Sequence, residues 1–267
     1  MNIGIVGCGG RMGRMLIQTV LETPGGTLAG GTEQPGSPFI GQDLGLLVGN
    51  DSVGAVVMDD ARALFEASDV VIDFTVPAAT AAHAAIAAET ATAMVIGTTG
   101  LTPEQQADVE AASHAAPVVQ AGNMSLGVNL LVGLAQQVAA TLGVEFDIEV
   151  VEMHHKHKID APSGTALMLG KAAAQGRGID HDEHAVLSRE GHTGARPEGA
   201  IGYATLRGGD VVGDHTVTFA VENERLEISH KAQSRQIFAR GAVHAALWSA
   251  RQKPGFYTMF DVLGIDS

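Results

Sequence analysis

The stretch that decides the fold is NIGIVGCGGRMGRML, residues 2–16, in which a glycine-rich loop follows a short apolar run and precedes an amphipathic segment. The glycines of the loop stand at positions 7, 9, 10 and 13. Glycine tolerates positive φ and lets backbone N–H groups approach a pyrophosphate, whose charge the dipole of the following helix stabilises. The spacing is G-x-G-G-x-x-G, because Met12 stands where the third glycine of G-x-G-x-x-G would fall. A strand before the loop and a helix after it favour dinucleotide binding over a simple tight turn.

An acidic residue supports the same interpretation. Glu33 lies twenty residues after Gly13 and directly follows a second apolar run, residues 27–32. A carboxylate at the end of the second strand of such a unit can accept hydrogen bonds from the ribose of an adenosine. We therefore include Glu33 in the predicted cofactor site.

Apolar runs and helix-like segments continue to alternate as far as about residue 123. Strands are predicted over residues 2–6, 27–32, 53–57, 70–74, 94–96 and 118–120, and helices over 11–21, 60–66, 77–89 and 103–114. This alternation predicts a parallel sheet that is covered by helices on both faces. Ligands of such sheets bind outside the carboxyl ends of the strands. The loops GTTG at 97–100 and AGNMS at 121–125 are therefore predicted to face the cofactor.

The remainder of the chain has an α+β pattern. We predict a helix over 126–142, a strand over 146–153, a helix over 165–174 and a final helix over 235–252 that returns to the first domain. Residues 215–221 and 225–229 alternate apolar and polar side chains around a short polar turn, which predicts an antiparallel hairpin. The prediction is a dinucleotide-binding α/β half followed by an α+β half.

Three interpretations fit VEMHHKHKIDAPSGTA, residues 151–166. A zinc site would use His154, His155 and His157, but zinc sites usually draw ligands from two separated clusters, and no second Cys or His pair with ligand spacing occurs. A solvated polar loop is the second interpretation. The third, which we favour, is anion binding combined with proton transfer. We therefore predict no metal.

The residues after the histidines carry this third interpretation. Ser163-Gly164-Thr165 opens a predicted helix whose N–H groups and dipole can hold a carboxylate, with Ser163 as the N-cap or an additional donor. Lys158 supplies a full positive charge to the same anion. A histidine beside it is the usual general acid or base. The segment therefore predicts a carboxylated substrate that is reduced beside a nicotinamide.

The composition limits the class of protein and of partner. The net charge is −14, with 30 acidic and 16 basic residues, which argues against nucleic acid or an anionic membrane as a partner. No apolar run approaches the ~20 residues that cross a bilayer. The N-terminus has no basic region of the kind that begins a signal peptide. A single cysteine, Cys8, suits a reducing compartment, so we expect a cytoplasmic protein.

With these motifs in place, the whole chain resembles the 4-hydroxy-tetrahydrodipicolinate reductase (dihydrodipicolinate reductase) family. The most specific match is EMHHKHKIDAPSGTA. The others are GCGGRMGR, DFTVP at 73–77, GTTG at 97–100, AGNMSLGVN at 121–129, RGGDVVGDHTV at 207–217 and ISHKAQSRQIFARGAVHAALW at 228–248.

The resemblance implies a Rossmann-type parallel-sheet domain, residues 1–124 and 236–267, and an α+β substrate-binding and tetramerisation domain, residues 125–235. It implies a homotetramer that transfers a hydride from NADH or NADPH to a cyclic dicarboxylate with loss of water, in diaminopimelate and lysine biosynthesis. Two other classes remain: another two-domain amino- or keto-acid dehydrogenase, and a non-catalytic dinucleotide-sensing protein.

The resemblance also implies roles for individual residues. His154 corresponds to the proton donor or acceptor and Lys158 to a second proton donor, while His157 has no implied role. The implied substrate contacts are His155, Lys158, Gly164 and Thr165. The implied cofactor contacts are Gly7, Cys8, Gly9, Gly10, Arg11, Met12, Glu33, Gly97, Thr98, Thr99, Ala121, Gly122, Asn123 and Met124.

One departure from the family bears on the cofactor. Many relatives that use NADPH well have an arginine directly after the acidic residue, where this chain has Gln34. A 2′-phosphate would then lack its guanidinium partner and would be repelled by Glu33. We therefore expect NADH to be favoured over NADPH.

Overall fold

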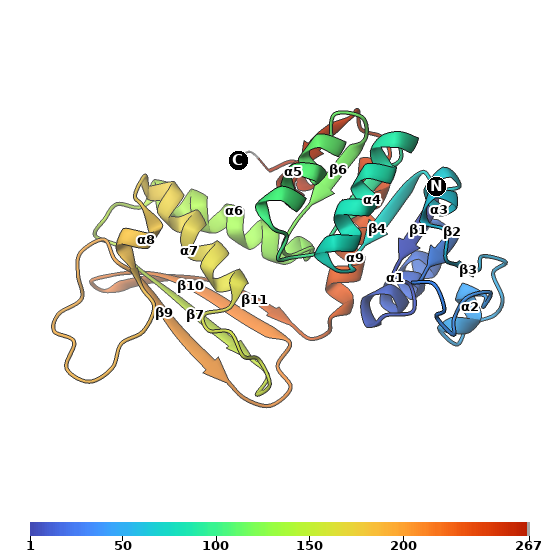
Figure 1. The fold of residues 1–267 in the computed structure, drawn as a ribbon. Helices are drawn as coiled ribbons and strands as arrows, with labels where there is room; N and C mark the ends of the chain where they lie inside the picture. Colours follow the sequence, from blue (N-terminus) through green and yellow to red (C-terminus); the bar gives the residue numbers. More distant parts are fainter. Residues whose placement is uncertain (266–267) are drawn as a thin grey trace. The chain divides into compact units, whose positions relative to one another are not determined.

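A computed structural model of the chain describes residues 1–265, which divide into two compact units (Figure 1). Unit 1 comprises Met1–Leu126 and the C-terminal segment from Gln236, and unit 2 comprises Gly127–Arg235. The last two residues of the segment 236–267, which we assigned to the first domain, lie outside the described part of the chain.

Unit 1 contains a seven-stranded sheet in the order β12-β6-β5-β4-β1-β2-β3, with every pair parallel. The strands are β1 (Asn2–Val6), β2 (Thr27–Thr32), β3 (Val57–Met58), β4 (Val70–Asp73), β5 (Ala93–Ile96), β6 (Pro117–Gln120) and β12 (Gly255–Tyr257). Strands β1 to β6 have the order 3-2-1-4-5-6 of a Rossmann fold, which confirms the predicted fold class. The order reverses between β1 and β4, and ligands of this fold bind at that point, outside the carboxyl ends of the strands.

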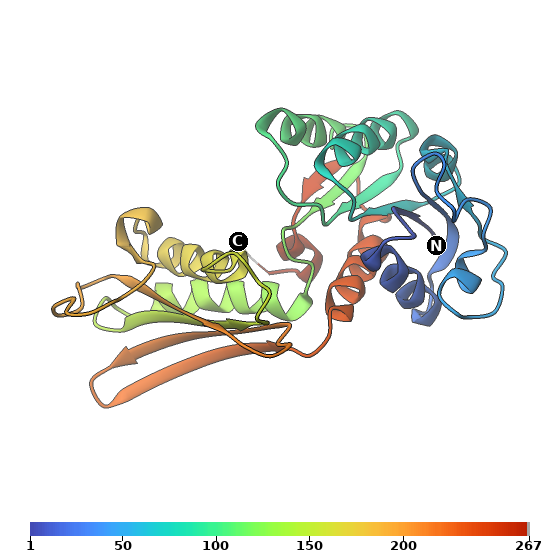
Figure 2. The ribbon, with the colours of Figure 1, turned by 60° about the horizontal axis from the view of Figure 1, so that its bottom comes forward.

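Helices cover both faces of this sheet. They are α1 (Arg11–Glu22), α2 (Leu44–Leu47), α3 (Ala61–Glu66), α4 (Pro77–Thr90), α5 (Pro103–Ala112), α9 (Gln236–Ser249) and α10 (Met259–Leu263). Figure 2 shows α4 and α5 on one face and α1 and α9 on the other. Every residue of β4 and β5 is consequently buried, which explains why these strands are almost continuously apolar. Pro77 and Pro103 occupy the first turns of their helices, as predicted.

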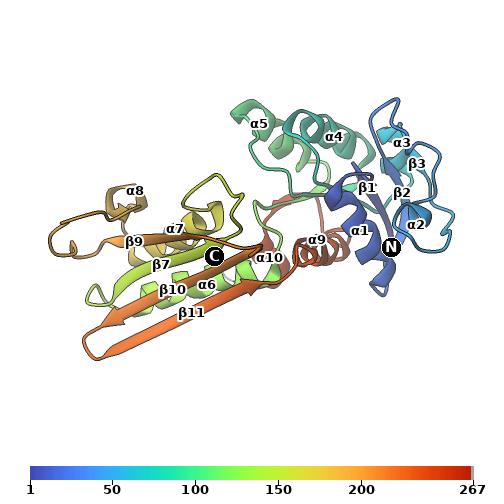
Figure 3. The same cartoon turned by 90° about the horizontal axis from the view of Figure 1, so that it is seen from below.

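Unit 2 contains a five-stranded sheet in the order β11-β10-β7-β9-β8. Its strands are β7 (Asp147–His154), β8 (Ala185–Val186), β9 (Ile201–Arg207), β10 (Gly213–Val221) and β11 (Glu224–Ala232), and its helices are α6 (Leu126–Thr141), α7 (Gly164–Arg177) and α8 (His181–His184). Figure 3 shows the predicted hairpin as β10 and β11 lying side by side. Strand β7 alternates strictly between partly exposed and buried residues, because α7 packs on one face of the sheet.

The sequence prediction differs from the structure at several elements, since α2, α8, β12 and α10 were not predicted and the final helix ends at Ser249. The strand predicted over 53–57 shortens to Val57–Met58, because the carboxylate of Asp43 accepts the N–H groups of Val53 and Gly54 and holds them in a loop. Strands β8 and β9 were not predicted. Segment 185–207 is rich in glycine and polar residues. Strand β8 pairs with β9, and β9 pairs with β7, which is distant from it in the sequence.

Candidate active site

The glycine loop of unit 1 requires glycine at two positions, 7 and 13. Gly7 has a φ of +66°, a left-handed conformation that glycine adopts without strain. A Cβ atom on Gly13 would lie 2.3 Å from the carbonyl oxygen of Gly7 and 2.6 Å from Cα of Cys8. Only glycine at position 13 therefore lets α1 begin so close to the end of β1. These are the two requirements that a pyrophosphate-binding loop places on its glycines.

Glu33 is fixed beside this loop. Its Oε1 accepts the N–H of Gly9 at 2.8 Å, and the N–H of Cys8 donates to the carbonyl of Thr32 at 3.1 Å. These bonds join the loop after β1 to the end of β2. The carboxylate of Glu33 therefore lies next to the glycine loop.

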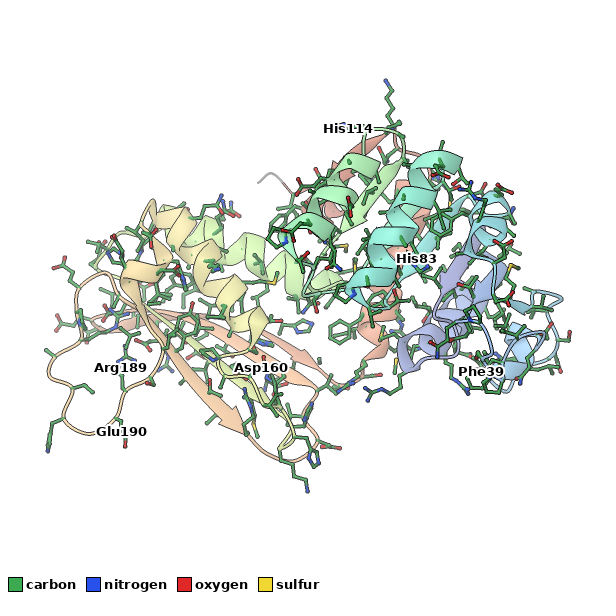
Figure 4. The ribbon with its side chains drawn as sticks, in the orientation of Figure 1. Phe39, His83, His114, Asp160, Arg189 and Glu190 are labelled. Atoms are coloured by element: carbon green, nitrogen blue, oxygen red, sulfur yellow. The ribbon has the colours of Figure 1, made fainter. Side chains whose placement is uncertain are left out.

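Two further residues at this loop were missed from the sequence. The ring of Phe39, labelled in Figure 4, would lie 2.5 Å from a Cβ atom on Gly9, so the loop and the ring are in close contact. The guanidinium of Arg14 lies 5.1 Å from the centre of the same ring and donates to the carbonyl of Gly9. No linear spacing connects residue 39 with the glycine loop, which is why sequence reasoning did not find it.

The loop after β5 is held by a buried carboxylate. Asp73 is fully buried at the end of β4 and accepts hydrogen bonds from the hydroxyls of Thr75, at 2.6 Å, and Thr98, at 3.2 Å. Nδ1 of His83 lies 2.8 Å from its other oxygen. The side chain of Thr98 thus positions the loop, whereas Thr99 is exposed.

The loops after β5 and β6 line one cavity of about 540 Å³ in unit 1, whose walls include Thr98, Thr99, Ala121 and Gly122. A Cβ atom on Gly97 would lie 2.2 Å from the Phe74 ring, so glycine is required there. The cavity brings together residues from the two loops that were predicted to face the cofactor.

The other two predicted cofactor residues of the β6 loop are positioned by hydrogen bonding and burial. Oδ1 of Asn123 accepts the N–H of Ser125 at 2.9 Å, and Met124 is 1% exposed. A Cβ atom on Gly241 of α9 would lie 1.6 Å from the carbonyl oxygen of Met124. The absence of a side chain at Gly241 therefore lets α9 support this loop.

In unit 2, the predicted proton donor is the last residue of β7. His154 is 8% exposed, and its Nδ1 lies 2.5 Å from Oε2 of Glu152. A carboxylate that accepts a hydrogen bond at Nδ1 selects the tautomer in which Nδ1 carries the hydrogen. This leaves Nε2 as the nitrogen that can exchange a proton with a ligand.

Glu152, which the sequence analysis did not select, is 1% exposed and lies at the centre of a hydrogen-bond network. Arg207 at the end of β9 donates to both carboxylate oxygens, at 2.8 and 2.9 Å, and the N–H of Ser163 donates to Oε1 at 3.1 Å. Burial by itself would raise the pKa of Glu152, but the hydrogen bonds from Arg207 and His154 outweigh it and lower the pKa. Glu152 is therefore a carboxylate at neutral pH.

The predicted anion-binding helix start is the N-terminus of α7. Ser163 is its N-cap, and Oγ of Ser163 accepts the N–H of Ala166 at 3.1 Å. Gly164 and Thr165 are the first two residues of the helix. A Cβ atom on Gly164 would meet nothing within 4 Å, so the space in front of the helix start is open. An anion can therefore approach the positive end of the helix dipole.

A buried histidine supports Ser163 from the sheet. Nε2 of His215 on β10 lies 3.0 Å from Oγ of Ser163, and its ring meets that of His154 edge-on at 5.0 Å between centres. His215 is 4% exposed, and burial, followed by the repulsion of His154, lowers the pKa of His215 to about 4. The ring is therefore neutral at pH 7. His215 was missed from the sequence because it lies 52 residues after Ser163.

The polar segment after β7 contains the remaining predicted residues. Nζ of Lys158 lies 2.8 Å from both carboxylate oxygens of Asp160, which is labelled in Figure 4. Nδ1 of His155 is buried and has no hydrogen-bond partner within residues 1–265. Burial, then the charge of Arg235, lowers the pKa of His155. His157 is exposed, consistent with a solvated loop residue.

Neither a metal cluster nor a membrane-spanning helix is found in the described part of the chain. Within residues 1–265, no three His, Cys, Asp or Glu side chains are grouped so that they could hold a metal ion. Over the same range, no helix has the length and apolar character needed to cross a membrane.

Comparison with known proteins gives the family. Residues 1–124 match the family model described as dihydrodipicolinate reductase, N-terminus, and residues 127–263 match the model for its C-terminus. The 4-hydroxy-tetrahydrodipicolinate reductases of Methylocella silvestris and Rhizobium meliloti are similar to this chain. The first is 55% identical and covers 99% of this chain and 97% of that protein, and the second is 54% identical and covers 100% and 98%.

A solved structure has the same fold. It is described as dipicolinate-bound dihydrodipicolinate reductase from Paenisporosarcina sp. TG-14, with a TM-score of 0.78, 24% identity and 97% coverage of both chains. The two family models and the similar relatives confirm the resemblance that the motifs indicated: this chain belongs to the 4-hydroxy-tetrahydrodipicolinate reductase (dihydrodipicolinate reductase) family.

Proposed function

We propose that this chain catalyses the reduction of 4-hydroxy-tetrahydrodipicolinate by NADH or NADPH. The products are tetrahydrodipicolinate, the oxidised nucleotide and water. A bound nicotinamide supplies the hydride, and the protein supplies one proton. The observation that carries the proposal is the pairing of His154 with Glu152 in the same unit as the open N-terminus of α7. This combination provides a proton donor and a carboxylate-binding element for one small anionic substrate.

Proton transfer is assigned to Nε2 of His154. Its Nδ1 is held by Glu152, so the ring has one position left for exchange with substrate. A ring held in this way can donate a proton from Nε2 and keep its contact with Glu152. Lys158 is the second proposed proton donor. Its ammonium forms an ion pair with Asp160, so a substrate carboxylate must replace Asp160 as its partner.

A substrate carboxylate is assigned to the N-terminus of α7. Gly164 and Thr165 provide the backbone of the first turn, and Lys158 and His155 complete the proposed contacts. The solved relative is described as dipicolinate-bound, and dipicolinate carries two carboxylates. One of these suits the helix start, where the dipole favours an anion.

The nucleotide is assigned to unit 1, at Gly7, Gly9, Gly10, Arg11, Met12, Glu33, Gly97, Thr98, Thr99, Ala121, Gly122, Asn123 and Met124, with Cys8 through its backbone. The Cys8 thiol is buried, and burial raises its pKa to about 12, so the side chain stays neutral. Gln34 is exposed directly after Glu33 and carries no charge. We propose on this basis that NADH is favoured, because a 2′-phosphate would be repelled by Glu33 and would lack a guanidinium partner at position 34.

The two domains are proposed to have separate roles. Residues 1–124 and 236–267 bind the dinucleotide, and residues 125–235 bind the substrate and form a homotetramer. The sheet face opposite α7 supports the last assignment, since it carries partly exposed Val151 and Met153 and exposed Ala204 and Leu206. Light scattering should give the mass of four chains. The single buried cysteine supports a cytoplasmic location.

The test of the proposed activity is NADH oxidation by purified protein with freshly synthesised 4-hydroxy-tetrahydrodipicolinate. Substrate-dependent oxidation and formation of tetrahydrodipicolinate are expected. Amino and keto acids serve as competing substrates, and a preference for one of them would favour a different dehydrogenase. NADH binding without oxidation of any substrate would favour a dinucleotide-sensing protein.

A further inference from the structure

The carboxylate of Glu152 contacts both parts of unit 2 that the proposed function uses. Its Oε2 lies 2.5 Å from Nδ1 of His154, and its Oε1 accepts the N–H of Ser163, the N-cap of α7, at 3.1 Å. Strand β7 ends at His154 and α7 begins at Gly164. One side chain therefore links the proposed proton donor to the proposed anion-binding helix start across a segment of polar loop.

The remaining contacts of this carboxylate fix its charge and orientation. Arg207 donates one N–H to each oxygen in a paired arrangement, and its Nη2 also donates to the carbonyl oxygen of Asp160 at 2.6 Å. In the β7–β9 register, Arg207 lies directly beside His154. Such a two-point contact holds an ionised carboxylate in one plane. Glu152 thus accepts hydrogen bonds and donates none.

An acceptor at this place determines which ring nitrogen of His154 carries the hydrogen. Because the carboxylate has no hydrogen to donate, Nδ1 must be the donor. A neutral His154 then has an unprotonated Nε2, and a charged His154 can release a proton from Nε2 without losing its contact with Glu152. The ring would otherwise have access to both tautomers.

We propose that Glu152 is a positioning residue of the reaction. It holds His154 in the Nδ1–H tautomer and anchors Ser163, so that the proton donor and the anion-binding helix start are fixed to the same carboxylate. This inference rests on the proposed role of His154, and the experiments below separate the two.

Glu152→Gln tests the tautomer with little change in shape. The Oε1 position receives hydrogen bonds from both Arg207 and Ser163, so the amide oxygen is expected there. The amide NH₂ then faces Nδ1 of His154, which must become an acceptor. We expect kcat to fall at least about 10²-fold, because the donor ring is in the wrong tautomer. KM should stay within about threefold, because the anchor at Ser163 is retained.

A double-mutant cycle separates positioning from a purely structural role. If Glu152 acts through His154, then Glu152→Gln added to His154→Gln should lower kcat by less than about twofold. An undiminished 10²-fold loss in that background would overturn the proposal. Glu149→Gln is the matched control, since Glu149 lies on the same strand and is likewise paired with arginine, in its case Arg189 and Arg196. Its kcat should match wild type within about twofold.

Nitrogen-15 NMR of the histidine rings gives a measurement that does not depend on turnover. Wild-type His154, assigned by comparison with His154→Gln, should show a protonated Nδ1 and an unprotonated Nε2 in the neutral form of its ring. Glu152→Gln should reverse the two signals. A wild-type ring with Nε2–H would overturn the proposal even if the variant failed to fold. If the protein instead showed the expected tautomer but no reductase activity, the proposed function would be wrong and the positioning of His154 by Glu152 would stand.

Discussion

Acidification should destabilise unit 2 through His215. Its pKa is lowered to about 4 from an ordinary value of 6.5, first by burial and then by His154, with smaller contributions from His230 and Lys158 and an opposing one from Glu152. The unfolded chain therefore takes up a proton near pH 6.5, whereas the folded chain takes it up only near pH 4. Between these values the unfolded state binds more protons, so stability falls as the pH falls. At about 1.4 kcal/mol per pH unit, the loss across this window is at most about 3.5 kcal/mol.

Urea unfolding followed by far-ultraviolet circular dichroism at pH 7, 5.5 and 4.5 measures this loss. His215→Gln keeps a polar side chain near Ser163 and removes the titrating group. Wild type should lose about 2 kcal/mol more than the variant between pH 7 and pH 4.5. His192→Gln is the control, because His192 is exposed and should leave the wild-type pH dependence unchanged. Parallel pH dependences for wild type and His215→Gln would refute the reasoning.

Three substitutions test the two predicted ligand sites. Gly13→Ala places a Cβ atom 2.3 Å from the Gly7 carbonyl oxygen. We therefore expect a loss of about 1–3 kcal/mol in the free energy of unfolding and weaker NADH binding in a fluorescence titration. NADH binding as tight as in wild type would contradict the role of the loop. Gln34→Arg adds a partner for a 2′-phosphate and should raise the ratio of kcat/KM for NADPH to that for NADH by about tenfold; an unchanged ratio would remove position 34 from cofactor selection. Lys158→Met should lower kcat/KM about 10²-fold in steady-state assays. Lys156→Met, at an exposed lysine, should leave kcat/KM unchanged. Equal effects of the two substitutions would show that only the net charge of the segment matters.

The parts of the site that are local in sequence could be predicted. The glycine loop has a spacing that reflects its own geometry, since Gly7 needs positive φ and Gly13 needs close approach. The start of α7 is equally local, because a serine N-cap acts on a residue three positions later. Short-range rules therefore predicted the glycine loop and the N-terminus of α7 as ligand sites, whereas the family resemblance was needed to select His154 among the histidines after residue 153.

The partners of these residues could not be predicted, because the sheet register brings them together. Arg207 reaches Glu152 only because β9 pairs with β7, and β9 was itself missed. His215 meets Ser163 through the pairing of β10 with β7. Phe39 reaches the glycine loop from the segment after β2. Contacts across 30 to 55 residues leave no spacing that a single sequence reveals.

The central claim is that His154 transfers the proton, and the steady-state kinetics of His154→Gln test it most directly. We expect a kcat at least about 10²-fold below wild type, with KM within about threefold of the wild-type value. His157→Gln, an exposed histidine three positions away, should match wild type. A His154→Gln enzyme with wild-type kcat would contradict the claim.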